Sequence, residues 1–96
     1  MRPKEDEVPL ERELTHEQLR ARVTDAIRET RCIVIDYQGK SRRGQRKIAP
    51  LQVESDMGHD YLHAWDFWRE DYRLFRLDRV LGLAVLEEKF DPEKYG

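Results

Sequence analysis

The sequence predicts a mainly β domain with one N-terminal helix, folded as a small, strongly bent, five-stranded antiparallel barrel. Three observations lead to this fold class. The chain has 96 residues, enough for one domain but too few for two separate cores. A helical apolar period covers residues 14–30, and five short segments rich in β-branched and aromatic residues follow it. Evenly spaced short strands are typical of small barrels, and we expect the helix to cover one open end.

The helix is expected in the stretch LTHEQLRARVTDAIRET. Thr15 followed by Gln18 is the pattern of a capping box, and Leu14 before the cap suits a hydrophobic staple with Leu19. Residues 1–13 alternate in charge and contain two prolines, so we expect them to form a flexible charged arm. One face of the helix is apolar and would pack on the sheet. Its residues are Leu19, Val23, Ala26 and Ile27.

Five segments are expected as strands because they are short, apolar and bounded by polar or glycine-containing stretches. Pro50 indicates an edge or a bulge in the second of them. We expect QGKSRRGQRK, between the first two, to be a polar loop, and residues 91–96 to be a C-terminal tail. The five strand segments are RCIVIDY (31–37), IAPLQVES (48–55), HDYLHAWDFW (59–68), RLFRL (73–77) and GLAVLEEKF (82–90).

The net charge of −2 hides a basic segment. GKSRRGQRK, residues 39–47, holds five positive charges and no acid. It is either an ordinary solvated hairpin loop or a collar that steers phosphate groups toward a site. Cys32 is the only cysteine, which leaves no internal disulfide. With no signal peptide and no apolar run of membrane-spanning length, a cytoplasmic location is expected.

The stretch YRLFRLDRV spaces Arg73, Arg76 and Arg79 three residues apart. This period fits neither a helix nor a strand, and we interpret it as a strand that buries Leu74 and then runs into a turn. Guanidinium groups bind phosphate oxygens in bidentate geometry, so one hypothesis is a phosphate site. In the other hypothesis an arginine pairs with a neighbouring acid, Asp71 or Asp78, while the remaining stems cover apolar surface.

Aromatic side chains are dense on the third predicted strand. Tyr61, His63 and Trp65 share one face of it, opposite Leu62 and Ala64. An aromatic ring beside arginines can stack a nucleic-acid base, at about 1–3 kcal/mol per base. Tyr61 is therefore a candidate stacking residue, with an ordinary packed tyrosine as the alternative.

Metal binding and catalysis are not expected. His59 and His63 lie four residues apart on a predicted strand, which separates their attachment points by about 13 Å. No serine or cysteine nucleophile has an evident base, and no glycine-rich loop suited to phosphate binding is present. The sequence indicates no cofactor.

Several motifs follow one another in a known order: a strand ending IDY, a basic loop, an IAPL strand, and RLFRLDRV. In this the chain resembles the WYL domain of bacterial transcriptional regulators, over residues 14–90. The resemblance implies an Sm-like, SH3-type barrel, which usually follows a winged-helix DNA-binding domain. The naming tripeptide here is Asp60-Tyr61-Leu62, so an acid replaces the family's tryptophan.

The resemblance implies a ligand-binding face built from the motif tyrosine and basic residues. Tyr61, Arg73, Arg76 and Arg79 would form its centre, and His63 shares the face of the motif tyrosine. Arg42, Arg43 and Arg46 would lie at its rim.

The expected function is that of a non-enzymatic sensing module that binds single-stranded DNA or RNA, or a nucleotide. It would act in bacterial transcriptional or nucleic-acid-defence regulation, through an effector protein or a DNA-binding domain outside this chain. The alternative is an adaptor for protein–protein interaction or homo-oligomerisation, in which the same arginines and exposed strand edges contact an acidic partner or another copy. Neither hypothesis involves a membrane.

Overall fold

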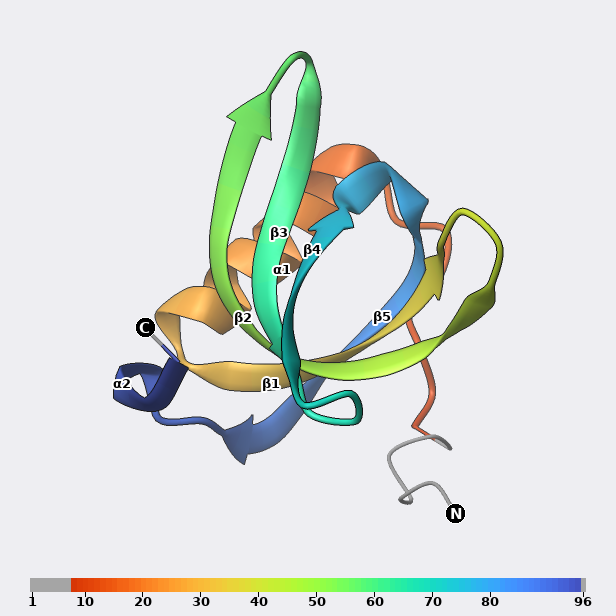
Figure 1. Cartoon of the computed structure of the whole chain (residues 1–96). Helices are drawn as coiled ribbons and strands as arrows, with labels where there is room; N and C mark the ends of the chain where they lie inside the picture. Colours follow the sequence, from red (N-terminus) through yellow and green to blue (C-terminus); the bar gives the residue numbers. More distant parts are fainter. Residues whose placement is uncertain (1–7, 96) are drawn as a thin grey trace.

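The computed structural model of the chain describes residues 8–95, which form one bent antiparallel sheet with a helix packed against it (Figure 1). Neighbouring strands follow the order β4-β3-β2-β1-β5. A short 3₁₀ helix, η2, carries the chain from β4 to β5. The elements are α1 (His16–Arg28), β1 (Arg31–Gln38), β2 (Arg43–Asp56), β3 (His59–Asp66), β4 (Asp71–Arg76), η2 (Leu77–Arg79), β5 (Val80–Lys89) and α2 (Pro92–Tyr95).

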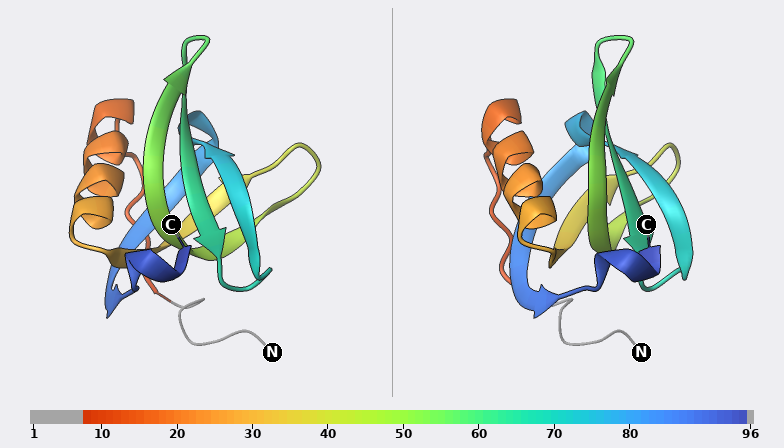
Figure 2. Two further views of the ribbon diagram at one scale, coloured as in Figure 1. Left: turned by 60° about the vertical axis from the view of Figure 1, so that its left-hand side comes forward. Right: turned by 90° about the vertical axis from the view of Figure 1, so that its left-hand side faces the viewer.

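Helix α1 begins as the sequence predicts. Thr15 is the N-cap: its side chain accepts a hydrogen bond from the Gln18 backbone, and the Gln18 side chain accepts one from the Thr15 backbone. Leu19, Val23 and Ala26 are buried. The helix contacts β1, β2, β5 and η2, so it closes one side of the bent sheet (Figure 2). Neither α1 nor α2, the helices among the described residues, is long and apolar enough to cross a membrane.

The predicted fold class is confirmed, but the sheet is not closed into a barrel. In the described part of the chain, β4 and β5 are the two edges and share no ladder of hydrogen bonds. Leu77 of η2, the segment that connects β4 to β5, is fully buried in the larger core, and η2 contacts β3 and α1. The two edges also differ. Glu11 forms a bridge to Leu83 beside β5, whereas no described segment pairs with the outer edge of β4.

Strand β2 is longer than the sequence predicts. It begins at Arg43, so the second half of the predicted loop is strand, and the true connection covers only residues 39–42. These polar residues become strand because β1 lies opposite, with Gln38 paired to Arg43 and Ile33 to Ile48. The register of β2 against β3 shifts between Pro50 and Gln52, which confirms the predicted bulge.

Strand β4 runs into a turn, as predicted, but it faces the other way. Phe75 is 2% exposed and packs in the core, whereas Leu74, the residue predicted to be buried, is 54% exposed. Register explains the difference. Phe75 pairs with the buried Leu62, and Leu74 pairs with His63 on the opposite face.

The core has two parts. The larger one joins the apolar face of α1 to the inner face of the sheet. The smaller one surrounds Cys32, Ala49 and Phe90, and both Trp65 and Tyr95 pack against it. Tyr95 belongs to α2, so the segment predicted as a tail contributes a packed ring. Of the predicted arm, residues 1–7 lie outside the described residues, and Arg12 binds Asp36 of β1 at 2.9 Å.

Candidate functional site: a basic pocket beside strand β4

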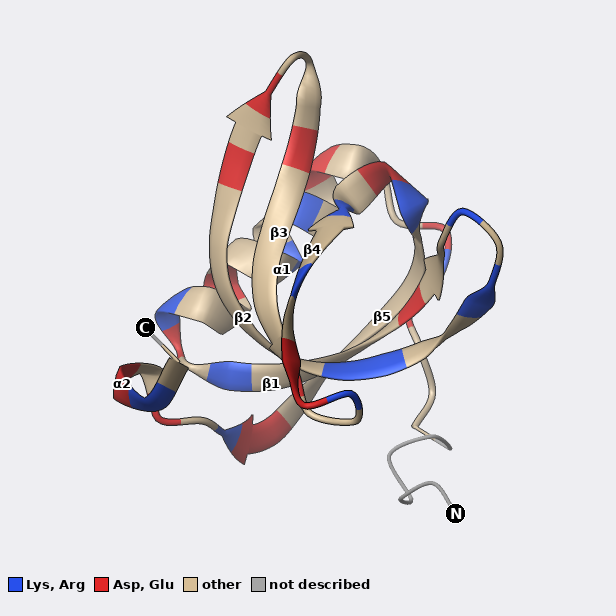
Figure 3. Ribbon diagram, viewed as in Figure 1, with Lys and Arg blue, Asp and Glu red and all other residues tan. Residues whose placement is uncertain are grey.

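A basic pocket lies between the β1–β2 connection and the first half of β4. Its volume is about 270 Å³. Lys and Arg segments of the β1–β2 connection, of β2 and of the β3–β4 turn border this part of the molecule in Figure 3. Among the residues that the structure describes, five basic side chains line the pocket and no carboxylate does. The lining residues are Tyr37, Gly39, Lys40, Ser41, Arg42, Arg46, Arg69, Arg73, Leu74 and Phe75.

Local backbone structure presents these cations. Lys40 and Arg42 lie on the connection between β1 and β2. Arg69 lies in the β3–β4 turn, which the carboxylate of Asp66 organises. Asp66 Oδ1 accepts hydrogen bonds from the backbone N–H of Trp68 at 3.0 Å and of Arg69 at 3.1 Å. A side chain that accepts hydrogen bonds from the following backbone favours such a turn.

Four of the five cations lack an acidic partner. Within residues 8–95, no Asp or Glu lies within 4.0 Å of the charged groups of Lys40, Arg42, Arg69 or Arg73. Like charges gathered at a concave surface raise the local positive potential. The pocket is therefore electrostatically suited to an anion, although the chain as a whole is slightly acidic.

Arg46 is held differently, at the buried side of the pocket. Its Nε lies 3.5 Å from Oδ2 of Asp66, and the two side chains are only 13% and 0% exposed. This ion pair is longer than a typical hydrogen bond, but the positive charge of Arg46 offsets the negative charge of the buried Asp66 carboxylate. Asp66 therefore links the turn that carries Arg69 to the strand that carries Arg46.

The remaining wall of the pocket is aromatic. The rings of Tyr37 and Phe75 meet edge to face, with their centroids 4.9 Å apart. The hydroxyl of Tyr37 accepts a hydrogen bond from the backbone N–H of Arg76 at 3.0 Å, which joins β1 to β4. An anion in the pocket would thus lie beside a fixed apolar surface, where charge–charge interactions are less screened than in open water.

Of the residues predicted for the site, the structure brings Arg42, Arg46 and Arg73 together in this pocket. Arg43 points elsewhere. It donates two hydrogen bonds to Asp36, at 3.2 and 2.8 Å, and Arg12 donates a third to the same carboxylate. The hydrogen bonds from Arg43, and secondarily from Arg12, hold the pKa of Asp36 below its ordinary value.

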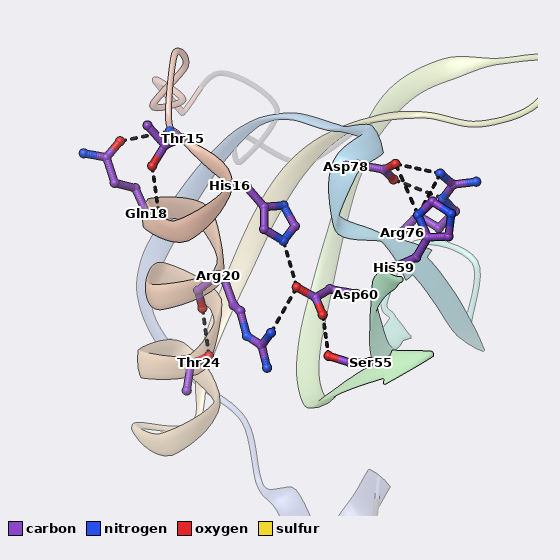
Figure 4. Close-up of polar contacts among 10 residues, drawn as sticks. All are labelled: Thr15, His16, Gln18, Arg20, Thr24, Ser55, His59, Asp60, Arg76 and Asp78. Atoms are coloured by element: carbon purple, nitrogen blue, oxygen red, sulfur yellow. Dashed lines mark hydrogen bonds and ion pairs between the residues drawn. The ribbon is translucent and has the colours of Figure 1, made fainter. Parts of the chain in front are cut away.

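Arg76 makes the structural pairing that the sequence left open as an alternative. Its Nε and one terminal nitrogen donate to the two oxygens of Asp78 at 3.0 and 2.6 Å (Figure 4). The same nitrogen lies 3.2 Å from Nδ1 of His59. The hydrogen bonds from Arg76 lower the pKa of Asp78. Arg79 lies in η2, outside the lining of the pocket.

Tyr61 and His63 lie on the outer face of β3 and are not among the residues that line the basic pocket. Tyr61 pairs across the sheet with Arg76, and His63 pairs with Leu74. His63 Nε2 lies 2.7 Å from a carboxylate oxygen of Glu54.

Asp60, where the family's tryptophan would stand, binds helix α1 (Figure 4). Its Oδ2 lies 2.7 Å from Nε2 of His16 and 3.0 Å from a guanidinium nitrogen of Arg20. Its Oδ1 accepts a hydrogen bond from the Ser55 hydroxyl at 2.5 Å. The Ser55 and His16 hydrogen bonds lower the pKa of Asp60. This acid is engaged by the helix and is not among the residues that line the basic pocket.

Sequence reasoning missed Tyr37, Lys40 and Arg69 as pocket residues. Lys40 was within the basic segment 39–47 and could have been singled out with it. Arg69 had no such signal, because only the pairing of β3 with β4 brings its turn beside the β1–β2 connection. Among the described residues, no group of three or more His, Cys, Asp or Glu side chains is arranged to hold a metal ion.

Comparison with known proteins identifies relatives for most of the chain. The family model described as WYL domain matches residues 18–85. Protein PafC of Mycobacterium tuberculosis (strain ATCC 25618 / H37Rv) is 39% identical over 74 residues, which are 75% of this chain and 23% of that protein. The uncharacterized HTH-type transcriptional regulator YobV of Bacillus subtilis (strain 168) is 33% identical over 75 residues, again 75% of this chain and 23% of that protein.

A solved structure is also similar. Proteasome accessory factor B/C (PafBC) of Arthrobacter aurescens matches with a TM-score of 0.75 and 28% identity, covering 83% of this chain and 13% of that one. The chain thus spans about a quarter or less of the length of these relatives.

Proposed function

We propose that this chain, which belongs to the WYL domain family, is a regulatory binding module. Its basic pocket would take a phosphate-bearing ligand. The ligand would be single-stranded nucleic acid or a nucleotide. The role is one of binding, without a catalytic step. The relatives include a protein named as an HTH-type transcriptional regulator, which supports a part in transcriptional control for this chain as well.

The observation that carries this proposal is the gathering of Lys40, Arg42, Arg69 and Arg73 around one pocket, with no acid of residues 8–95 within ion-pairing distance of them. Elsewhere, several arginines of the sheet have a carboxylate within ion-pairing distance, as Arg43 and Arg76 do. Unneutralised guanidinium groups bind phosphate oxygens strongly, with two parallel hydrogen bonds where the geometry allows. A phosphate group would supply the negative charge that neutralises these cations.

The aromatic wall supports a ligand larger than inorganic phosphate. Tyr37 and Phe75, whose rings meet edge to face, line the pocket together with the cations, and the pocket volume of about 270 Å³ exceeds what one phosphate group fills. We therefore expect the ligand to place a sugar or a second phosphate in the same pocket.

The test is fluorescence anisotropy with labelled single-stranded DNA, single-stranded RNA and duplex DNA, at two salt concentrations. The double variant Arg42→Ala/Arg69→Ala should lose binding, because it removes two of the unpaired cations. Arg28→Ala is the matched control, since Arg28 is a surface arginine of α1 that pairs with Asp25. Undiminished binding by the double variant would show that the pocket is not the site.

A further inference from the structure

Two cavities meet at one strand on this molecule. Besides the basic pocket, a groove of about 230 Å³ lies on the β3–β4 hairpin. Arg73 and Leu74 line both cavities. The groove is lined by His63, Ala64, Tyr72, Arg73 and Leu74. A ligand held by Arg73 in the basic pocket therefore lies next to the groove.

The register of β3 and β4 gives the groove an aromatic and apolar surface. His63 pairs with Leu74, and Trp65 pairs with Tyr72, so these side chains share the outer face of the hairpin. Tyr72 and Leu74 are each 54% exposed. They belong to an edge strand whose outer edge pairs with no other described strand.

Tyr72 is exposed but held in place. Its hydroxyl donates a hydrogen bond to the backbone oxygen of Tyr95 at 3.0 Å. Its ring meets Trp65 edge to face at a centroid distance of 4.9 Å, and Trp65 in turn stacks on Tyr95 at 5.4 Å. A ring that is already ordered loses little conformational freedom when a planar group stacks on it.

We infer that the groove formed by Tyr72, Leu74 and His63 is a nucleobase subsite, adjoining the phosphate-binding pocket through Arg73. This inference rests on the proposed function and adds the chemical class of the neighbouring group. Base stacking on an aromatic platform beside a cationic groove is how single strands are held without strict sequence preference. A duplex keeps its bases stacked inside the helix, so none of them could stack on Tyr72, and the groove would add nothing to the affinity for a duplex.

The experiment compares an oligothymidylate with an abasic phosphodiester of the same length and charge, both as labelled probes for the full chain. The native chain should bind the oligothymidylate roughly 5- to 150-fold more tightly, the equivalent of the ~1–3 kcal/mol typical of stacking one base. Tyr72→Ala should reduce this ratio to about one while leaving affinity for the abasic strand unchanged. Thymidine monophosphate, run as a competitor, tests whether one nucleotide fills both cavities or whether a longer strand is needed.

Two further variants make the result specific. Tyr72→Phe keeps the ring and removes only the hydrogen bond to Tyr95, so the preference for the base-bearing strand should persist. Tyr61→Ala removes an aromatic ring from the same hairpin but outside the groove, and it should also keep the preference.

The failures of the two proposals are distinguishable. Equal affinity of the native chain for both strands, with both lost in Arg42→Ala/Arg69→Ala, would overturn the base subsite and leave the phosphate pocket standing. Loss of the preference in Tyr61→Ala and not in Tyr72→Ala would also overturn the subsite. Absence of binding to either strand at low salt, with no binding of single-stranded RNA or thymidine monophosphate either, would overturn the proposed function and the subsite together.

Discussion

At the scale of single residues, an arginine's role in this chain follows from whether an acid is within reach. Asp78 lies two residues after Arg76 and binds it with both oxygens. Arg73 has no such partner among the described residues and lines both cavities. Paired arginines stabilise a local geometry, whereas an unpaired arginine at a pocket keeps its hydrogen-bonding capacity for a ligand.

A pair of neighbouring residues tests the direction in which β4 faces. Phe75→Ala should destabilise the fold by about 3–5 kcal/mol, because it empties a buried core position. Leu74→Ala should change stability by no more than about 0.5 kcal/mol, since that side chain lies on the surface. Urea denaturation of both variants measures the difference, and a larger cost for Leu74 would show that the strand is turned the other way.

At the scale of elements, Asp60 links helix α1 to the β2–β3 hairpin, the part of the sheet that projects furthest from the domain in Figure 1. The acid receives hydrogen bonds from both sides, from Arg20 of the helix and from Ser55 of β2. The hairpin turn itself uses Met57 and Gly58 at positive φ, the conformation that a tight two-residue hairpin requires. The helix thus holds the hairpin at the Ser55–Asp60 pair, one residue pair before its turn.

Asp60→Asn should lower the melting temperature at pH 7 by about 4–8 °C, the effect of losing about 1 kcal/mol in a domain of this size. The folded pKa of Asp60 is lowered, so its stabilising contribution is complete above the ordinary carboxyl pKa of about 3.9 and disappears as the pH falls through the folded value. The difference between native chain and variant should therefore persist from pH 7 to about pH 5 and vanish in more acidic solution.

Thermal melts followed by circular dichroism across this pH range measure the effect of Asp60. Asp25→Asn, which removes an exposed ion pair within α1, is the control and should shift the melting temperature by less. A difference between Asp60→Asn and the native chain that persists undiminished in strongly acidic solution would contradict the assigned role.

At the scale of the whole molecule, elements that follow from local pattern could be predicted and those that depend on distant pairing could not. The capping box of Thr15 and the bulge near Pro50 are local features, and both are confirmed. The extra length of β2 depends on β1 lying opposite residues 43–47, and the open sheet depends on which strands pair, since β4 and β5 do not pair with each other. Neither of these arrangements is visible in the spacing of apolar residues.

In the candidate site, too, the features that depend on local sequence could be predicted, and those that depend on distant segments coming together could not. The basic character of residues 39–47 and the importance of Arg73 could be inferred from composition, but their meeting with Arg69 required three segments to be placed in space. Predicting which arginines are neutralised also required the pairs Arg43–Asp36 and Arg76–Asp78. The binding roles of Tyr61, His63, Arg76 and Arg79 stay predictions.

Salt dependence is a property of the whole charged surface. If two to four phosphates of a single strand are neutralised by the pocket, the logarithm of the binding constant should fall with the logarithm of salt concentration at a slope of about −1.4 to −2.8. Anisotropy titrations at several salt concentrations give this slope. A slope near zero would indicate binding through apolar contacts alone.

The most direct measurement of the central claim compares Arg73→Ala with Arg76→Ala for single-strand binding at one moderate salt concentration. We predict that Arg73→Ala weakens binding by roughly 10- to 150-fold, because it removes an unpaired, charge-assisted contact of about 1.5–3 kcal/mol. Arg76→Ala should change affinity by no more than about twofold, since its guanidinium is already bound to Asp78. Equal losses in the two variants, or a loss in Arg76→Ala alone, would contradict a phosphate site in the basic pocket.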